Sequence, residues 1–115
     1  MMTPEGIAIL DKLAPFVRRA KCCEKGREKL ARSQRTLAFV LIAEDISENS
    51  RKEALRGFSC PVYQALTAAE IERRFGLQNT KLLGFRKGGL GDQLEPAFAG
   101  CRVFLEPPTP PPAAQ

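Results

Sequence analysis

The sequence predicts an α/β fold, a three-layer α/β/α sandwich in which helices cover both faces of a central sheet. A continuous apolar run at residues 37–43 is typical of a strand that is buried on both faces. Two further short strands are expected at residues 60–64 and 81–85. Helical patterns separate these three segments, and such alternation of strands and helices is typical of the α/β class.

The first helix is expected to begin at Pro4. Thr3 is a suitable N-cap, proline fits the first helical position, and Glu5 favours the first turn. Apolar residues then recur at helical spacing. Pro15 lies inside this pattern and cannot donate a helical hydrogen bond, so we expect a kink or two shorter helices.

A second helix is expected over residues 26–33, with its N-terminus near residues 23–26. Lys25, Lys29 and Arg32 fall on one side of this helix, roughly opposite Leu30. The pattern therefore predicts a basic ridge on the solvent face.

The next two helices have clear start and stop signals. Ser47 is expected to cap a helix that runs to about residue 58. Thr67 and Glu70 have the spacing of a capping box, and Gly76 should end the helix that they open.

The C-terminal part of the sequence contains one more helix. A glycine-rich turn over residues 87–91 leads into a helix near residues 93–98, and residues 101–105 could add an edge strand. We expect residues 1–105 to form a single RNA-binding-type α/β/α domain, on grounds given below. Residues 106–115 are proline-rich and are expected to form a flexible tail.

The positive charge of the chain is concentrated near its start. Lys and Arg number 18 against 13 Asp and Glu, for a net charge of +5. Residues 18–35 hold eight bases and two acids, whereas residues 36–115 are neutral in sum. A concentrated basic face is the usual electrostatic footprint of a polyanion, most often nucleic acid. A solubilising surface charge is the alternative interpretation.

The cysteines and the apolar segments do not favour a secreted protein, a membrane protein or a metalloprotein. The longest apolar run is too short to span a membrane, and the first residues lack the apolar core of a signal peptide, so we expect a cytoplasmic protein with no membrane contact. No histidine and no Cys-Xaa-Xaa-Cys motif supports a metal site. A thiol-dependent enzyme or redox sensor is a further alternative, and it requires that Lys21 and Lys25 lower the pKa of Cys22 or Cys23.

Two loops are candidate ligand sites. Glu44 and Asp45 follow the buried strand, where ligands of open α/β sheets usually bind, and could hold Mg²⁺ or act as acid and base. Stabilisation of the start of the following helix is the favoured interpretation of this pair. The turn at residues 86–91 could hold a phosphate, yet it lacks the spacing of a nucleotide-binding loop. Neither loop indicates an enzyme, a cofactor or a small-molecule substrate.

Several segments together carry a family resemblance. They are Arg18-Arg19-Ala20, the helix that follows, Leu41-Ile42-Ala43-Glu44-Asp45-Ile46-Ser47-Glu48-Asn49, Cys60-Pro61-Val62-Tyr63 and Arg74-Phe75-Gly76-Leu77. Over roughly residues 7–98 the chain resembles the L-seven-Ae / L-thirty-e superfamily of small RNA-binding ribosomal-type proteins, and most of all its bacterial YlxQ-like branch. The resemblance implies an α/β/α sandwich around a mixed sheet of about four strands.

The same resemblance implies binding to RNA, often to a kink-turn, whose sheared G·A pairs are contacted from the start of the second helix. There the family has Gly-Xaa-Asn-Glu followed by a lysine one turn later. This sequence has Glu24-Lys25-Gly26-Arg27, with Lys29 near the lysine position, and lacks the asparagine and glutamate that contact base edges. The family's second contact surface matches Leu77-Gln78-Asn79-Thr80, which offers one apolar and three polar groups to an extruded base.

We therefore expect a non-enzymatic protein that grips structured RNA, kink-turn-like or ribosomal, through its basic second helix. The expected contact residues are Lys21, Lys25, Gly26, Arg27, Lys29, Arg32, Glu44, Asp45, Leu77, Gln78, Asn79 and Thr80. The alternative is a protein-interaction module on the same fold that has lost RNA specificity. Whether such a protein associates with the ribosome is left open.

Overall fold

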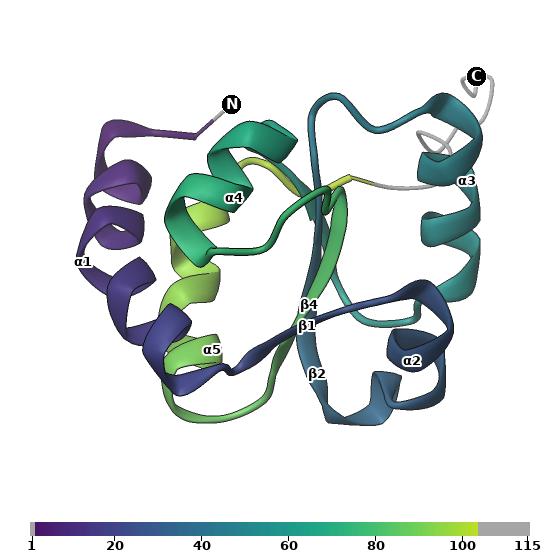
Figure 1. Cartoon of the computed structure of the whole chain (residues 1–115), viewed down its shortest axis with the longest axis horizontal. Coiled ribbons are helices and arrows are strands. Elements are labelled where there is room, and N and C mark those ends of the chain that lie inside the picture. Colours follow the sequence, from purple (N-terminus) through teal and green to yellow (C-terminus); the bar gives the residue numbers. More distant parts are fainter. Residues whose placement is uncertain (1, 104–115) are drawn as a thin grey trace, which may run out of the picture.

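A mixed four-stranded sheet separates two layers of helices in the computed structural model, which describes residues 2–103 (Figure 1). Its strands, in the spatial order β1-β4-β2-β3, are β1 (Cys23–Lys25), β4 (Leu82–Arg86), β2 (Leu37–Ile42) and β3 (Val62–Gln64). Strand β2 pairs parallel with β3 and antiparallel with β4, and β1 pairs antiparallel with β4. The predicted α/β/α sandwich with a mixed sheet is confirmed.

The helices divide between the two faces of the sheet (Figure 1). On one face lie α1 (Pro4–Ala20), α4 (Ala68–Phe75), α5 (Gly89–Leu94) and the 3₁₀ turn η2 (Glu95–Phe98). On the other face lie α2 (Arg27–Arg32) and α3 (Glu48–Gly57), and the 3₁₀ turn η1 (Gln34–Thr36) connects α2 to β2.

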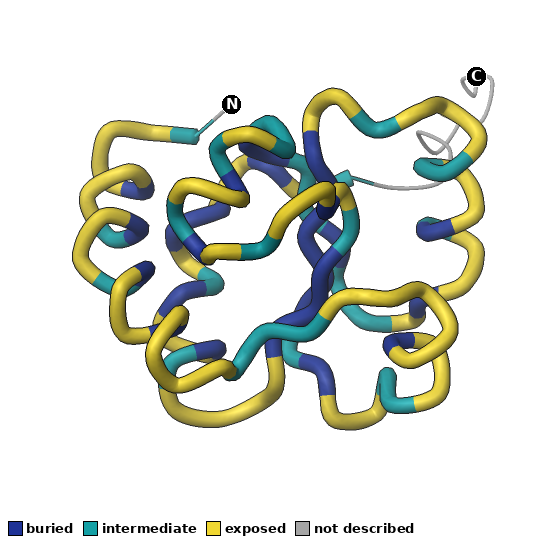
Figure 2. The backbone as a smooth tube through the Cα atoms, viewed as in Figure 1, coloured by how far each residue is buried: buried dark blue, intermediate teal, exposed yellow. Residues whose placement is uncertain are grey.

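Strand β2 supplies side chains to both hydrophobic cores. Phe39 and Leu41 pack into the core under α1, α4 and α5, whereas Val40 and Ile42 pack into the core under α2 and α3. All four side chains are fully buried, and Figure 2 shows the centre of the sheet as the most buried part of the backbone. A strand that alternates between two cores has no polar face, which explains the continuous apolar run.

The predicted helix signals are confirmed. The hydroxyl of Thr3 accepts from the backbone of α1 at 3.0 Å, and Ser47 accepts from the backbone of α3 at 3.2 Å. Thr67 and Glu70 form the complete capping box of α4, and Gly76 ends that helix in the left-handed conformation. Pro15 was expected to cause a kink or to divide the first helix in two, and the second of these alternatives is wrong, because α1 is a single element.

Three other elements differ from the prediction. Residues 23–25 form the edge strand β1 and not the approach to a helix, because β4 offers them a pairing partner. Helix α5 begins at Gly89, four residues before its expected start, with two further glycines in or beside its first turn. Arg102 forms an isolated antiparallel bridge to Tyr63. Residues 104–105 of the expected edge strand and the proline-rich segment 106–115 lie outside the described residues.

Gly84 allows α2 to approach the sheet closely. A Cβ atom at this position of β4 would lie 2.6 Å from Cδ2 of Leu30 and 2.9 Å from Cδ2 of Leu37. Both leucines are buried, so neither side chain can move aside into solvent. The absence of a side chain at Gly84 therefore sets how closely α2 packs on β4.

We expect Gly84→Ala to lower the free energy of unfolding by about 1–3 kcal/mol, because an extra methyl group overpacks the core between Leu30 and Leu37. Urea unfolding followed by circular dichroism measures this change. Gly57→Ala is the matched control, since nothing lies within 4 Å of a Cβ atom there and alanine favours the helix by about 0.4–1 kcal/mol. Equal stability of Gly84→Ala and the wild type would contradict the proposed role of Gly84.

Candidate nucleic-acid interface

A surface cavity of about 380 Å³ lies where α2, α3 and the loop before β4 meet; we call it the interface cavity. Ten residues line it: Lys25, Gly26 and Arg27 at the start of α2, Ile46, Ser47 and Ser50 at the start of α3, and Asn79, Thr80, Lys81 and Leu82 at the start of β4. Segments more than fifty residues apart in the sequence thus form one site. Its rim carries positive charge and hydroxyl groups, and its apolar lining comes from Ile46 and Leu82.

Gly26 directly precedes α2 and has a φ of 103°, a backbone conformation that residues with a side chain rarely adopt. No side chain caps this end of the helix, and Gly26 itself is exposed. The backbone amides at the start of α2 are therefore open to a ligand that approaches Gly26. Leu30 anchors α2 to the sheet, because its side chain is fully buried against Gly84 of β4.

The loop before β4 is held in shape by its own residues. Asn79 adopts a left-handed conformation, with φ of 53°. Thr80 is only 3% exposed, and its hydroxyl donates to the carbonyl of Gln78 at 3.0 Å. Thr80 therefore stabilises the loop, while Gln78 and Asn79 present exposed polar side chains.

Of the three cations predicted to form a basic ridge on the second helix, Lys29 and Arg32 lie in α2, whereas Lys25 lies in β1. Lys25, Lys29 and Arg32 are exposed, and Leu30 on the opposite side is buried. Arg27 pairs with Glu53 of α3, and both side chains are about half-exposed. An exposed pair of this kind contributes about 0–1 kcal/mol, so a phosphate group can replace the carboxylate at little cost.

Glu24 neutralises part of this ridge. Its Oε1 atom lies 2.9 Å from the guanidinium of Arg86 and 3.2 Å from Nζ of Lys29. The Glu24 side chain is only 11% exposed, and hydrogen bonds from Arg86 and then Lys29 hold the pKa of its carboxyl below the usual value, against the effect of burial. The net charge of residues 18–35 already counts Glu24, so the fold leaves that charge unchanged and concentrates the carboxylate beside Lys29 and Arg86.

Seven of the twelve predicted contact residues do not line the interface cavity, namely Lys21, Lys29, Arg32, Glu44, Asp45, Leu77 and Gln78. Lys21 and Leu77 line a separate hollow beside α1 and α4, and Glu44 lines a third hollow with Arg74. Asp45 accepts a hydrogen bond from the backbone N–H of Ala68 at 3.0 Å, and so stabilises the start of α4. Glu44 and Asp45 were expected to stabilise the start of α3, which follows them directly. Asp45 instead stabilises the start of α4.

Sequence reasoning missed the part of the cavity that comes from α3. Ser47 had been recognised only as an N-cap, and Ser50 and Ile46 gave no signal of their own. Arg86 was also missed as a partner of Glu24, since 62 residues separate the two. The antiparallel pairing of β1 with β4, which places Glu24 opposite Gly84, brings them together.

Three of the cysteines, Cys22, Cys23 and Cys60, have a raised pKa, whereas a catalytic thiol requires a lowered one. Burial raises the pKa of Cys23 to about 11, and it also raises the pKa of Cys22 and Cys60. The four cysteines are free thiols. Between residues 2 and 103, no three His, Cys, Asp or Glu side chains come together as metal ligands, and no helix is long and apolar enough to cross a membrane.

Solved structures share this fold. A protein of unknown function from Bacillus halodurans C aligns with a TM-score of 0.69 at 18% identity, over 79% of this chain and 96% of that one. The Giardia lamblia 15.5kD RNA binding protein aligns with a TM-score of 0.61 at 14% identity, over 86% of this chain and 89% of that one. No protein-family model and no curated protein matches the sequence. Structural similarity at these low sequence identities shows that the fold is shared.

We expect Glu24 to make the stability of the wild type depend on acid pH. Because its pKa is lowered in the folded state, its ion pairs stabilise the fold above the ordinary carboxyl pKa of about 4.3, and this contribution disappears as the pH falls through the lower folded pKa. Urea unfolding between pH 3 and pH 6 should show a difference between the wild type and Glu24→Gln that vanishes in acid. Glu28→Gln, which removes a carboxylate outside the ion pairs of residues 2–103, is the control; a difference independent of pH for Glu24→Gln would contradict the prediction.

We expect Cys22 and Cys23 to react slowly with iodoacetamide at neutral pH. A pKa of about 11 instead of 9.0 lowers the thiolate fraction of Cys23 roughly a hundredfold. Mass spectrometry of the labelled peptides measures the rates, with the same protein in urea as the reference. Faster labelling of either cysteine in the folded protein than in urea would support a thiol-dependent function.

Proposed function

We propose that this protein is a non-enzymatic RNA-binding protein of the L-seven-Ae / L-thirty-e type, and that it grips structured RNA through the interface cavity. The observation that carries the proposal is the meeting of the basic start of α2 with the exposed polar loop before β4 around one cavity. The fold that places them together is shared with an RNA-binding protein of Giardia lamblia, which supports the same class of ligand.

The chemistry of the cavity suits a nucleotide. Lys25 and Arg27 supply charge for phosphate groups, and Gly26 lets a phosphate approach the backbone amides. The apolar groups of Ile46 and Leu82 offer a surface for the face of a base that has left its stack. The hydroxyls of Ser47 and Ser50 and the amide of Asn79 are donors and acceptors for base edges or the ribose 2′-hydroxyl.

The residues at the start of α2 favour phosphate contacts over base-edge contacts. Gly26 and Arg27 stand where the superfamily has the asparagine and glutamate that contact the sheared G·A pairs. A glycine has no side chain to discriminate bases, and a guanidinium pairs readily with phosphate. We propose recognition of RNA by shape and backbone, with kink-turn-like and ribosomal RNA as the ligands to examine first and the YlxQ-like branch as the group of origin.

We expect Lys25→Ala with Arg27→Ala to weaken binding to every structured RNA in a panel. Loss of two phosphate contacts should reduce the slope of log K against log salt by about 1–2, because fewer counterions are released on binding. Fluorescence anisotropy at several salt concentrations measures both the affinity and the slope. Uniform weakening across RNA sequences would distinguish phosphate contacts from base contacts.

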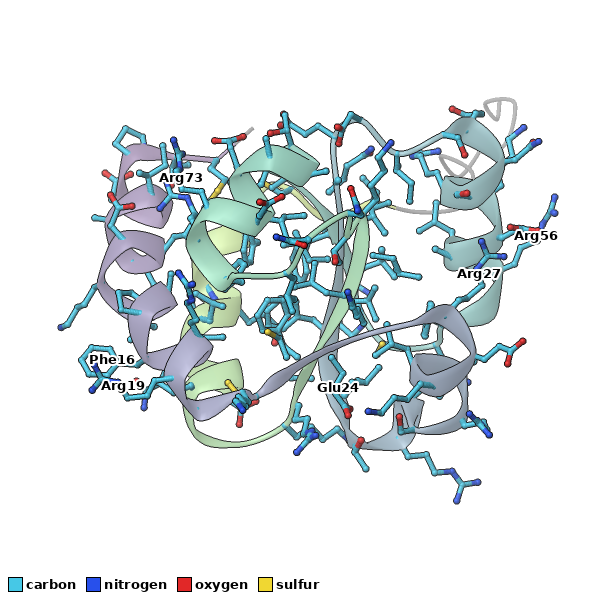
Figure 3. All side chains as sticks on the ribbon, viewed as in Figure 1. Phe16, Arg19, Glu24, Arg27, Arg56 and Arg73 are labelled. Atoms are coloured by element: carbon cyan, nitrogen blue, oxygen red, sulfur yellow. The ribbon has the colours of Figure 1, made fainter. Side chains whose placement is uncertain are left out.

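Lys52→Ala with Arg56→Ala is the matched control, since it removes two exposed cations from α3 that do not line the interface cavity. Figure 3 shows Arg56 at the outer side of α3. This control should keep most of the affinity and slope. If no structured RNA binds the wild type in a salt-sensitive way at low ionic strength, the proposal is wrong. Retention of a protein partner after ribonuclease treatment would then favour the alternative, a protein-interaction module.

A further inference from the structure

A second basic surface lies between α1 and α4, outside the interface cavity. Two adjoining hollows of about 610 Å³ and 360 Å³ share Arg18 and Lys21, and we call them together the α1–α4 groove. Its larger part is lined by Arg18, Arg19, Lys21, Arg73 and Arg74, against the single carboxylate of Asp11. Its smaller part has an apolar lining that includes Phe75 and Leu77.

The carboxylate of this groove is already engaged. Asp11 pairs with Arg74, and Arg73 has only a 3.9 Å contact to the half-buried Glu70 on its own helix. Arg18, Arg19 and Lys21 have no carboxylate partner among residues 2–103. Cations in the last turns of α1 and α4 complement the helix dipoles, but cations from two helices that face one groove also repel one another. A polyanion in the groove relieves that repulsion.

The end of α4 positions Arg18 over the groove. Gly76 closes α4 with φ of 74°, and a Cβ atom there would lie 2.8 Å from Nε of Arg18. The guanidinium therefore lies directly against the bare Cα of Gly76. A side chain at position 76 would displace the guanidinium, so Gly76 allows Arg18 to lie beside the end of α4.

The α1–α4 groove and the interface cavity adjoin along two segments of the chain. In the loop before β4, Leu77 lines the groove and Asn79 lines the cavity. In β1, Cys23 lines the groove and Lys25 lines the cavity, which is a separation of about 7 Å along a strand. A nucleic-acid strand that leaves the cavity at Asn79 therefore passes over one loop residue, Gln78, before it reaches the groove at Leu77.

We infer that an RNA strand held in the interface cavity continues over the loop at residues 77–80 into the α1–α4 groove, where the cations of α1 and α4 bind its phosphate backbone. This inference rests on the proposed function and extends it. The groove supplies charge and apolar surface and few groups that discriminate bases. It therefore adds affinity and length of contact without sequence preference.

The test compares a kink-turn hairpin with the same hairpin carrying a single-stranded 3′ extension of about ten nucleotides. The wild type should bind the extended hairpin about tenfold tighter and with a steeper salt dependence. Arg19→Gln with Arg73→Gln should abolish that gain and leave the affinity for the short hairpin unchanged. Both arginines are exposed, and Arg73 has only its 3.9 Å contact with Glu70 on the same helix, so the variant should stay folded, with at most a small decrease in unfolding temperature from the lost helix-dipole contributions.

The controls separate failure of this inference from failure of the proposed function. Lys52→Gln with Arg56→Gln, which changes the charge equally on α3, should keep the gain. Equal affinity of the wild type for both hairpins, or equal loss on both in Arg19→Gln with Arg73→Gln, would overturn the inference alone. Absence of salt-sensitive binding to either hairpin would overturn the proposed function and the inference with it. Competition by poly-glutamate that depends on Arg19 and Arg73, without any gain from the extension, would assign the groove to an acidic protein and overturn the inference.

Discussion

The packing of Leu30 on Gly84 is the contact on which the candidate site depends. Helix α2 has six residues, no side-chain cap and one buried side chain, and a helix of this length does not form alone in water. It exists because Leu30 is buried where β4 has no side chain. Strand β4 also follows directly on the loop at residues 78–81. One contact therefore fixes both halves of the interface cavity relative to each other, and a small shift of α2 would separate the backbone at Gly26 from Asn79.

The acidic residues around α2 shape the site as much as the basic ones. Glu24 binds Lys29 and Arg86, and Glu53 binds Arg27, so three cations are held in defined places before any ligand arrives. Exposed ion pairs exchange readily, because each contributes little free energy in water. The partly buried Glu24 is different, since it keeps its partners unless the pH falls. In the proposed function, Arg27 would leave the carboxylate of Glu53 and bind a phosphate group. Lys29 would bind phosphate while it is still paired with Glu24.

The sequence predicted most of the fold because its strongest signals are local. Thr3, Ser47 and the Thr67–Glu70 capping box mark helix starts through contacts within one turn, and the central strand has no polar face. Strand β1 was missed because its pairing comes from β4, some sixty residues away. The start of α5 was missed because glycine is a poor helix former, and α5 begins in a glycine-rich segment. Gly91 is needed there for a tertiary reason, because a Cβ atom at this position would lie 2.1 Å from the carbonyl oxygen of Arg86.

The candidate site was predicted only from its charge pattern and from the resemblance. Lys25, Gly26, Arg27 and Asn79 do meet at one cavity, but nothing local to Ser50 indicates that it lines the same cavity, and nothing local to Arg86 indicates that it pairs with Glu24. The charge count also treated residues 18–35 as one patch. The fold divides them between two surfaces, with Arg18, Arg19 and Lys21 in the α1–α4 groove and the cations of α2 at the interface cavity. One long basic segment thus becomes two adjoining surfaces, which in the proposed function would contact different parts of the RNA. That division is what a protein needs if it follows the backbone of a folded RNA and does not read its bases, and it is consistent with a glycine and an arginine at the start of α2.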